Sequence, residues 1–134
     1  MFAGNYSAGN PSFIGRGFYE DAQVTGRIQI SSPAGLYHIY KGSIHYIVNG
    51  VEYLVKNPSY DYTWIPSGNG EYVENAISPG YTPGREVHFV GRIQIDGRTF
   101  YGKMLPNVGM YYEDADQKEI LAKKYEIIVC NIAK

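Results

Sequence analysis

Side chains that could bind a polar ligand alternate along residues 92–103, RIQIDGRTFYGK. The Asp96-Gly97 pair supplies the two positive-φ positions of a type I′ turn, so this segment is predicted to be a β-hairpin. Its register points one set of side chains toward the core: Ile93, Ile95 and Phe100. The opposite face would carry two cations, an amide, a hydroxyl and a ring: Arg92, Gln94, Thr99, Tyr101 and Lys103. Such groups can bind a hydroxyl-rich ligand, although a solvated outer face explains the same pattern.

No other constellation indicates catalysis, a metal or a cofactor. Two carboxylate pairs could do acid–base work, although adjacent carboxylates in turns are usually solvated: Glu20-Asp21 and Glu113-Asp114. The histidines lack the spacing of metal ligands: His38, His45 and His88. A nucleophile elbow and a phosphate-binding loop are also missing. We therefore expect a protein that is not an enzyme and that uses no metal or cofactor.

A near-identical heptapeptide occurs twice, as VTGRIQI at residues 24–30 and FVGRIQI at residues 89–95. The glycines of the two copies, Gly26 and Gly91, are 91 − 26 = 65 residues apart. At the same offset Tyr46 matches Tyr111, and further matches continue along the chain. The sequence therefore predicts two tandem repeats, at about 5–65 and 70–131, joined by residues 65–70.

Short alternating runs rich in Tyr, Val and Ile, punctuated by Gly and Pro, predict an all-β fold. Asn49-Gly50 suggests a second type I′ hairpin, which would join residues 44–48 to residues 51–55. The segment ADQKEILAKKYE, at residues 115–126, is predicted to form a turn and a strand. A repeat of about 65 residues would be marginal alone, so we expect one antiparallel domain over residues 1–134 with pseudo-twofold symmetry.

Composition limits the kinds of partner that the protein can bind. Lys and Arg number 12 and Asp and Glu number 13, which gives a net charge of −1 and no field to hold nucleic acid or anionic lipid. No apolar run approaches the ~20 residues of a membrane span. The single cysteine, Cys130, forms no internal disulfide, and residues 1–13 lack the features of a signal peptide. We expect a cytoplasmic protein, or one secreted by a route without a signal peptide.

The second half resembles a DM-nine (DM9) repeat. That family's units carry, in order, Asn-Ala, Gly-Tyr-Asp, an apolar VGR strand, Gly-Lys and a closing Tyr-Glu strand. The second half contains these in order, with the second shortened to Gly-Tyr: Asn75-Ala76, Gly80-Tyr81, Val90-Gly91-Arg92, Gly102-Lys103 and Tyr125-Glu126. The first half keeps fewer of them, with Gly26-Arg27 and Tyr60-Asp61, and has Tyr37-His38 where Gly-Lys would stand.

The resemblance implies a compact all-β domain with pseudo-twofold symmetry. The family includes tandem-repeat mannose-binding lectins and the front domains of natterin-like pore-forming toxins. In the lectins, an Asp after Gly-Tyr, an acid after the hairpin glycine and the Lys of Gly-Lys hold the sugar. Here the lysine is Lys103, whereas Thr82 and Arg98 stand at the acidic positions and Asp96 lies in the adjacent turn.

By this resemblance we expect a carbohydrate-binding, lectin-like module for mannose-type glycans. Its ligand-binding residues would come from both halves, with two acids of the first half replacing the missing acceptors: Lys103, Asp96, Arg98, Tyr81, Thr82, Glu20, Asp21 and His38. The loss of the family's acids leaves an alternative open. Under that alternative the chain is a protein-interaction or targeting module with eroded sugar sites, either toxin-associated or forming a homo-oligomer.

Overall fold

The computed structural model describes residues 3–7, 10–30, 34–40, 42–81, 86–114, 116 and 118–133. None of these residues is helical, and all strand pairs are antiparallel, so the all-β prediction is confirmed. The strands are β1 Ala3–Ser7, β2 Asn10–Tyr19, β3 Ala22–Gln29, β4 Gly35–Tyr40, β5 Ser43–Ile47, β6 Glu52–Tyr53, β7 Tyr60–Gly68, β8 Gly80–Tyr81, β9 Val87–Ile95, β10 Arg98–Leu105, β11 Gly109–Glu113, β12 Glu119–Ala122 and β13 Lys124–Ile132.

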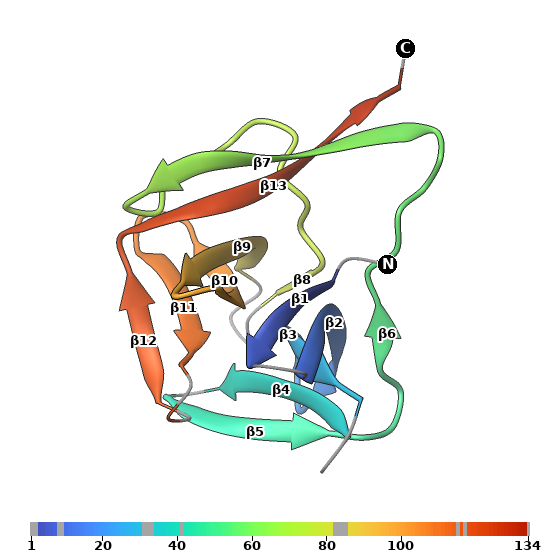
Figure 1. Cartoon of the computed structure of the whole chain (residues 1–134), viewed down its shortest axis with the longest axis vertical. Helices are drawn as coiled ribbons and strands as arrows, with labels where there is room; N and C mark the ends of the chain where they lie inside the picture. The colour runs from blue at the N-terminus through green and yellow to red at the C-terminus, as the bar shows by residue number, and fades with distance from the viewer. Residues whose placement is uncertain are drawn as a thin grey trace.

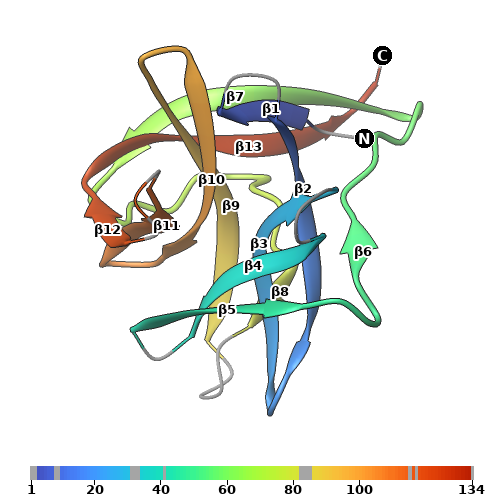
Figure 2. The ribbon, with the colours of Figure 1, turned by 60° about the horizontal axis from the view of Figure 1, so that its bottom comes forward.

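The strands form one sheet that nearly closes into a barrel (Figure 1). Its main path runs β1-β2-β3-β8-β9-β10-β11-β12, while β4 and β5 branch from β3, and β13 and β7 branch from β9. The long β7–β13 ribbon crosses one end of the molecule, and β4 and β5 lie at the opposite end (Figures 1 and 2). Strands of the two halves therefore belong to the same sheet.

The hairpin of β9 and β10 forms as expected. Asp96 and Gly97 have φ angles of 50° and 77°, which are the positive values of a type I′ turn. The register is the predicted one, with Arg98 opposite Ile95 and Tyr101 opposite Arg92. This prediction is confirmed because the turn residues and the flanking apolar alternation specify the same pairing.

The hairpin predicted at Asn49-Gly50 is wrong. Gly50 has a positive φ of 70°, but among the described residues Asn49 is not one with a positive φ. β5 pairs with β4, and β6 pairs with β2, opposite Gly15 and Arg16. The partners available elsewhere in the sheet therefore override the local preference of the Asn-Gly pair for a hairpin turn.

The region predicted as a turn and a strand, residues 115–126, contains β12 and the start of β13, and its described residues are not helical. The joint predicted at residues 65–70 is strand until Gly68 and then a turn. Asn69 and Gly70 in that turn have φ angles of 54° and 70°. The two halves are thus connected by a long strand and a tight turn.

The core has three clusters of buried side chains. One belongs to the second half and is centred on Phe89, Phe100 and Met110; another belongs to the first half and is centred on Val24 and Leu36. The third is shared by both halves and contains Ile14, Val90, Tyr101 and Ile128. β7 and β13 also pair along their whole lengths, from Tyr60 opposite Ile132 to Gly68 opposite Lys124.

The prediction that one face of β10 is polar and points away from the core is wrong for two of its residues. Tyr101 and Thr99 are 6% and 8% exposed, whereas Ile95, expected in the core, is 41% exposed. Tyr101 packs in the shared cluster with Ile14 of the first half. Both faces of β10 are buried near its middle because the first half covers the face that an isolated hairpin would expose to solvent.

The strand register changes which residues of β4 and β10 correspond between the two halves. Tyr37 lies opposite Arg27, just as Tyr101 lies opposite Arg92. The connection between β3 and β4 is one residue longer than that between β9 and β10, since Gln29 pairs with Gly35 but Gln94 pairs with Thr99. His38 therefore does not replace the lysine; it stands where Gly102 stands.

Strand pairing does not follow a single scheme in both halves. β13 pairs with both β7 and β9, whereas in the described part of the chain β7 pairs with β13 alone. Near the start of each half the correspondence also changes. Ala22 and Val87 correspond at the fixed offset, but their strand partners, Tyr19 and Tyr81, do not lie at that offset. The fixed offset of 65 thus holds for β3 and β9 but not for β2 and β8.

Candidate functional site

Each half contributes rows of polar side chains, aligned across adjacent strands, to the contact between the halves. In the first half, Arg27, Tyr37 and Tyr46 stand side by side across β3, β4 and β5. In the second half, Lys103 pairs with Tyr111 across β10 and β11, and Glu113 pairs with Glu119 across β11 and β12. Cross-strand partners share a face of the sheet, so each row presents its side chains together: Lys103 with Tyr111, and Glu113 with Glu119.

Arg27 is the centre of the contact between the halves. Its guanidinium lies over the Tyr37 ring, 4.4 Å from the centroid. Its Nη2 donates to Oε1 of Glu113 at 2.7 Å, and its Nη1 donates to Gln29 at 2.9 Å. The side chains of Arg27 and Glu113 are only 4% and 6% exposed. Since the pair lies in the interior, removing either partner would leave the other charge buried without this ion pair.

Glu113 was expected to be a solvated turn residue, and this expectation is wrong because it is buried against Arg27. Its neighbour in the sequence, Asp114, behaves as a turn residue, since its Oδ1 accepts hydrogen bonds from the backbone N–H groups of Asp116 and Lys118. The sequence offers no local pattern that separates these two acids. Their difference depends on an arginine 86 residues before Glu113.

Lys103 also connects the halves. Its Nζ donates to the carbonyl oxygen of Ile39 at 2.8 Å. By the register of the two hairpins, Ile39 is the residue that corresponds to Lys103, so the bond joins equivalent positions of the two repeats. Burial lowers the pKa of Lys103, and the charge of Glu119 partly offsets this effect. One of the three N–H donors of the ammonium is used in this bond.

Two buried histidines line the same junction. Nε2 of His88 is 2.6 Å from the Thr25 hydroxyl, and burial together with the charge of Lys103 lowers the pKa of His88 to about 3. His38 packs against Tyr19, with ring centroids 4.9 Å apart. Burial first, and then the charges of His45 and Lys103, lower the pKa of His38 to about 4. Both histidines are therefore neutral near pH 7.

A cavity between these rows has a volume of about 20 Å³. Among the residues that line it are Arg27, His38, Lys103 and Glu113. This volume holds roughly one water molecule. This cavity is therefore too small for a sugar ring.

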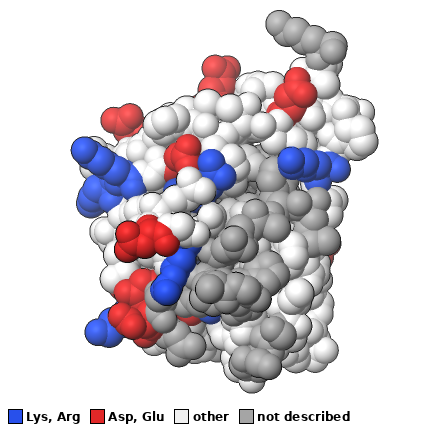
Figure 3. Space-filling model, viewed as in Figure 1, with Lys and Arg blue, Asp and Glu red and all other residues white. Residues whose placement is uncertain are grey.

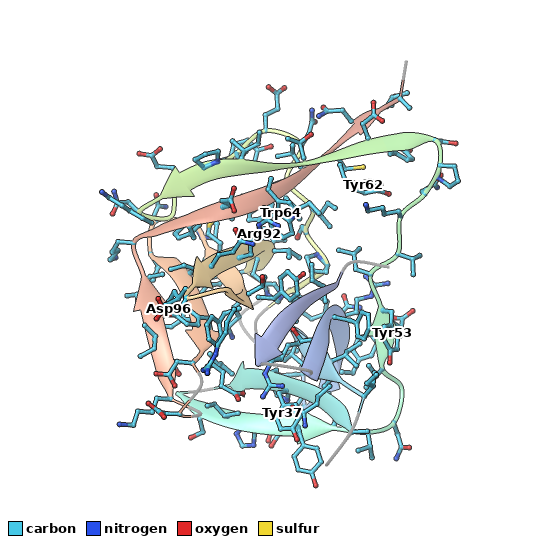
Figure 4. The ribbon with its side chains drawn as sticks, viewed as in Figure 1. Tyr37, Tyr53, Tyr62, Trp64, Arg92 and Asp96 are labelled. Carbon is cyan, nitrogen blue, oxygen red and sulfur yellow. The ribbon has the colours of Figure 1, made fainter. Side chains whose placement is uncertain are left out.

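Beside this cavity lies a wider groove, which we call the inter-repeat groove. Its volume is about 800 Å³, and its walls come from both halves: Tyr37, Gly42, Ser43, Ile44, His45, Tyr46, Lys118 and Glu119. Tyr37 and Tyr46 stack with centroids 5.5 Å apart and planes at 22°. Tyr46 is 54% exposed, and Figure 4 shows Tyr37 beside β4 and β5.

Glu119 contributes an acceptor at this groove. Its Oε2 is buried, and no side chain or backbone group of the described residues forms a hydrogen bond with it. Lys118 precedes it in the chain and is exposed. The groove thus combines an aromatic surface, a cation and a carboxylate, which are suited to a neutral ligand rich in hydroxyl groups.

None of the predicted ligand-binding residues that the structure describes lines this groove. Asp96 and Arg98 are exposed and line a separate groove of about 390 Å³ with Asp114 and Asp116. Figure 4 shows Asp96 well away from Tyr37. Tyr81 lies in β8, opposite Gln23 of β3. Glu20 and Asp21 form the turn between β2 and β3, and Thr82 lies outside the described residues.

Of the predicted set, the structure brings Lys103 and His38 together at the small cavity, and Asp96 and Arg98 together at a separate groove. The groove residues Tyr46 and Glu119 were not predicted to bind ligand. The repeat offset marks Tyr46, because it matches Tyr111, but the match says nothing about exposure. No pattern in the sequence distinguishes Glu119 from the exposed acids of the chain.

Charges of both signs are interspersed on the face drawn in Figure 3. None of the described residues forms a helix long and apolar enough to cross a membrane. Within the same described ranges, no three His, Cys, Asp or Glu side chains are grouped as metal ligands would be.

A family model described as "DM9 repeat" matches residues 5–122, which is most of the chain. No curated protein sequence matches the chain.

Proposed function

Because this chain belongs to the DM9 repeat family, we propose that it is a carbohydrate-binding module that recognises mannose-type glycans without catalysis. The inter-repeat groove is the site that best fits this function. Its exposed Tyr46 ring can pack on the apolar face of a sugar, and Glu119 and Lys118 supply an acceptor and a donor for its hydroxyl groups. The combination of these groups in one open groove carries the proposal.

The absence of catalysis is part of the proposal. Glycoside hydrolysis generally needs two carboxyl groups flanking the bond that is cleaved. Glu113 and Glu119 are cross-strand neighbours, but Glu113 is bound to Arg27 and lines the small cavity. Of the described acids, Glu119 is the one that lines the groove. A single carboxylate can hold a sugar but cannot act as both acid and base across its glycosidic bond.

A glycan array followed by calorimetry tests the function. The purified protein should bind mannose-containing glycans, and Tyr46→Ala should weaken that binding by about tenfold, since it removes the exposed ring of the groove. Tyr72→Ala is the matched control, because Tyr72 is also exposed but does not line the groove. Absence of binding to every glycan at millimolar concentration would exclude the proposal.

A second candidate is the interaction module, and one observation favours it. The first half exposes several large apolar side chains around a groove of about 610 Å³ that has no charged residue in its lining: Ile30, Val48 and Tyr53 among others. Exposed apolar surface of this kind often marks a protein contact. Analytical ultracentrifugation distinguishes the candidates, because a self-associating module gives a concentration-dependent mass whether or not glycan is present.

A further inference from the structure

We propose that the inter-repeat groove binds a stretch of a glycan chain in preference to a single terminal sugar, and that Glu119 is the acceptor that fixes the chain in the groove. The proposal rests on the carbohydrate-binding function proposed above and assigns the size of ligand to that same site. It is carried by the shape of the junction and by the position of one carboxylate.

The shape argument compares the two adjoining spaces. The cavity between the polar rows has a volume of about 20 Å³, which is too small for even one sugar ring. Lys103 occupies its wall and is held there by its bond to Ile39. The open space beside it is about 800 Å³, within the range of roughly 300–1,000 Å³ that accommodates ligands larger than one sugar ring.

Contacts on opposite walls favour a ligand that spans the groove. Tyr46 belongs to β5 of the first half, and Glu119 begins β12 of the second half. Tyr37, between Arg27 and Tyr46, has its two ring faces covered by these neighbours. Tyr46 is therefore the outer ring of the stack and is the one available to a ligand. A ligand that uses both Tyr46 and Glu119 must reach from one half of the protein to the other.

Glu119 has a specific reason to bind a hydroxyl donor. Glu119 lines the groove with a partly exposed side chain, and its shielded Oε2 has no hydrogen-bond partner within the described part of the chain. The partner of the neighbouring carboxylate, Arg27, is already engaged by Glu113. The partly exposed carboxylate of Glu119 can therefore accept a hydrogen bond from a ligand hydroxyl in the groove.

Calorimetry with mannose and with linear manno-oligosaccharides of increasing length tests the proposal. The trisaccharide should bind the wild-type protein at least about tenfold more tightly than mannose. Glu119→Gln keeps the size of the side chain but removes its charge and one of its two acceptor oxygens, so it should weaken trisaccharide binding by about tenfold or more. Glu74→Gln is the control, because Glu74 is exposed and does not line the groove.

The outcomes separate this proposal from the proposed function. If mannose binds as tightly as its trisaccharide, the protein remains a carbohydrate-binding module but the preference for a chain is refuted. If the length dependence is found and Glu119→Gln binds like the wild type, the role of Glu119 is refuted. If neither mannose nor any of its oligomers binds, the mannose-type function fails and this inference fails with it. The length series uses the wild-type protein, so it decides the question even if the variant does not fold.

Discussion

Arg27 and Arg92 occupy the same place in the two copies of GRIQI, and each lies 4.4 Å over an aromatic ring, yet their surroundings differ. Arg27 is buried and binds Glu113 of the other half. Arg92 stacks on Trp64, as Figure 4 shows, and binds Glu126 of its own half at 2.8 Å. The side chains of Arg92 and Glu126 are 24% and 32% exposed.

The comparison shows how a repeated sequence can acquire two structural roles. The Arg27 pair lies where the halves meet, and both of its side chains are buried. The Arg92 pair lies at the β9–β13 contact and stays partly solvated. Ion pairs become more consequential as they lose water, because an unpaired charge has no solvent to stabilise it. Arg27 should therefore contribute far more to the stability of the fold than Arg92.

The largest expected effect comes from separating the two regions completely. Residues 1–66 expressed alone lose the partner of Arg27, the pairing of β7 with β13 and most of the shared core cluster. We expect no cooperative unfolding transition in circular dichroism or calorimetry, because the remaining core is too small. A sharp and reversible melt of this fragment would show that the first half folds independently.

The next effect concerns the buried arginine alone. Arg27→Met leaves Glu113 buried without its partner, so the free energy of unfolding should fall by about 3–5 kcal/mol. Urea denaturation measures the loss. Replacing both residues, as in Arg27→Met with Glu113→Gln, should recover part of it, since no charge then remains buried. Equal instability of the single and double variants would show that packing of the arginine, and not its charge, is what matters.

Acid should lower the free energy of unfolding through the two buried histidines of the junction, and not through the Arg92 region. The folded-state pKa values of His38 and His88 are about 4 and about 3, below the unfolded value of about 6.5. The unfolded state therefore binds more protons in this window, and stability is lost as pH falls from about 6.5 toward these values. Each histidine contributes up to about 1.4 kcal/mol per pH unit.

His88→Gln isolates one of these contributions, because glutamine can keep a hydrogen bond to Thr25 but does not titrate. Urea unfolding between about pH 6.5 and pH 4 should show a shallower loss of stability for this variant than for the wild type. Arg92→Met should keep the wild-type slope. A variant slope equal to that of the wild type would mean that His88 is protonated as readily in the folded protein as in the unfolded chain.

Lys103→Met should have a moderate effect on stability. The variant keeps the aliphatic stem and loses the bond from Nζ to the Ile39 carbonyl, which is worth about 1–2 kcal/mol once the relief of burying a cation is included. If Lys103 also binds glycan, as its place in the family motif predicts, calorimetry should show affinity for manno-oligosaccharides falling by about tenfold. Unchanged affinity would confine Lys103 to joining the halves.

The predictability of the fold differed from place to place for physical reasons. Asp96-Gly97 was predicted correctly because a short hairpin depends on residues that are adjacent in the sequence. Asn49-Gly50 carries the same preference, but β2 offers the following residues a partner that no local pattern reveals. Buried residues of β10 were assigned to solvent because the strand that covers them lies in the other repeat.

The site was less predictable than the fold. The family motif drew attention to Lys103, which lies at the junction, but its partner is a backbone oxygen that no side-chain pattern identifies. Arg27 and Glu113 are 86 positions apart, and an isolated sequence gives no indication of contacts over that distance. Glu119 is notable because its Oε2 is buried without a partner among the described residues, and burial depends on the assembled sheet.

The smallest expected effect belongs to the second copy of the arginine. Arg92→Met removes a partly solvated ion pair and a cation–π contact with Trp64, which together stabilise the fold by about 1 kcal/mol. Because water can stabilise the Glu126 carboxylate after the change, no buried charge is left behind. The comparison between the repeats thus becomes quantitative: in urea denaturation, the loss of unfolding free energy for Arg27→Met should be about three times larger than for Arg92→Met, or more.

Raising the salt concentration should narrow the difference in stability between wild type and Arg92→Met, since salt screens exposed pairs but not the buried Arg27 pair. A loss for Arg92→Met as large as that for Arg27→Met would mean that burial does not determine the weight of the two arginines.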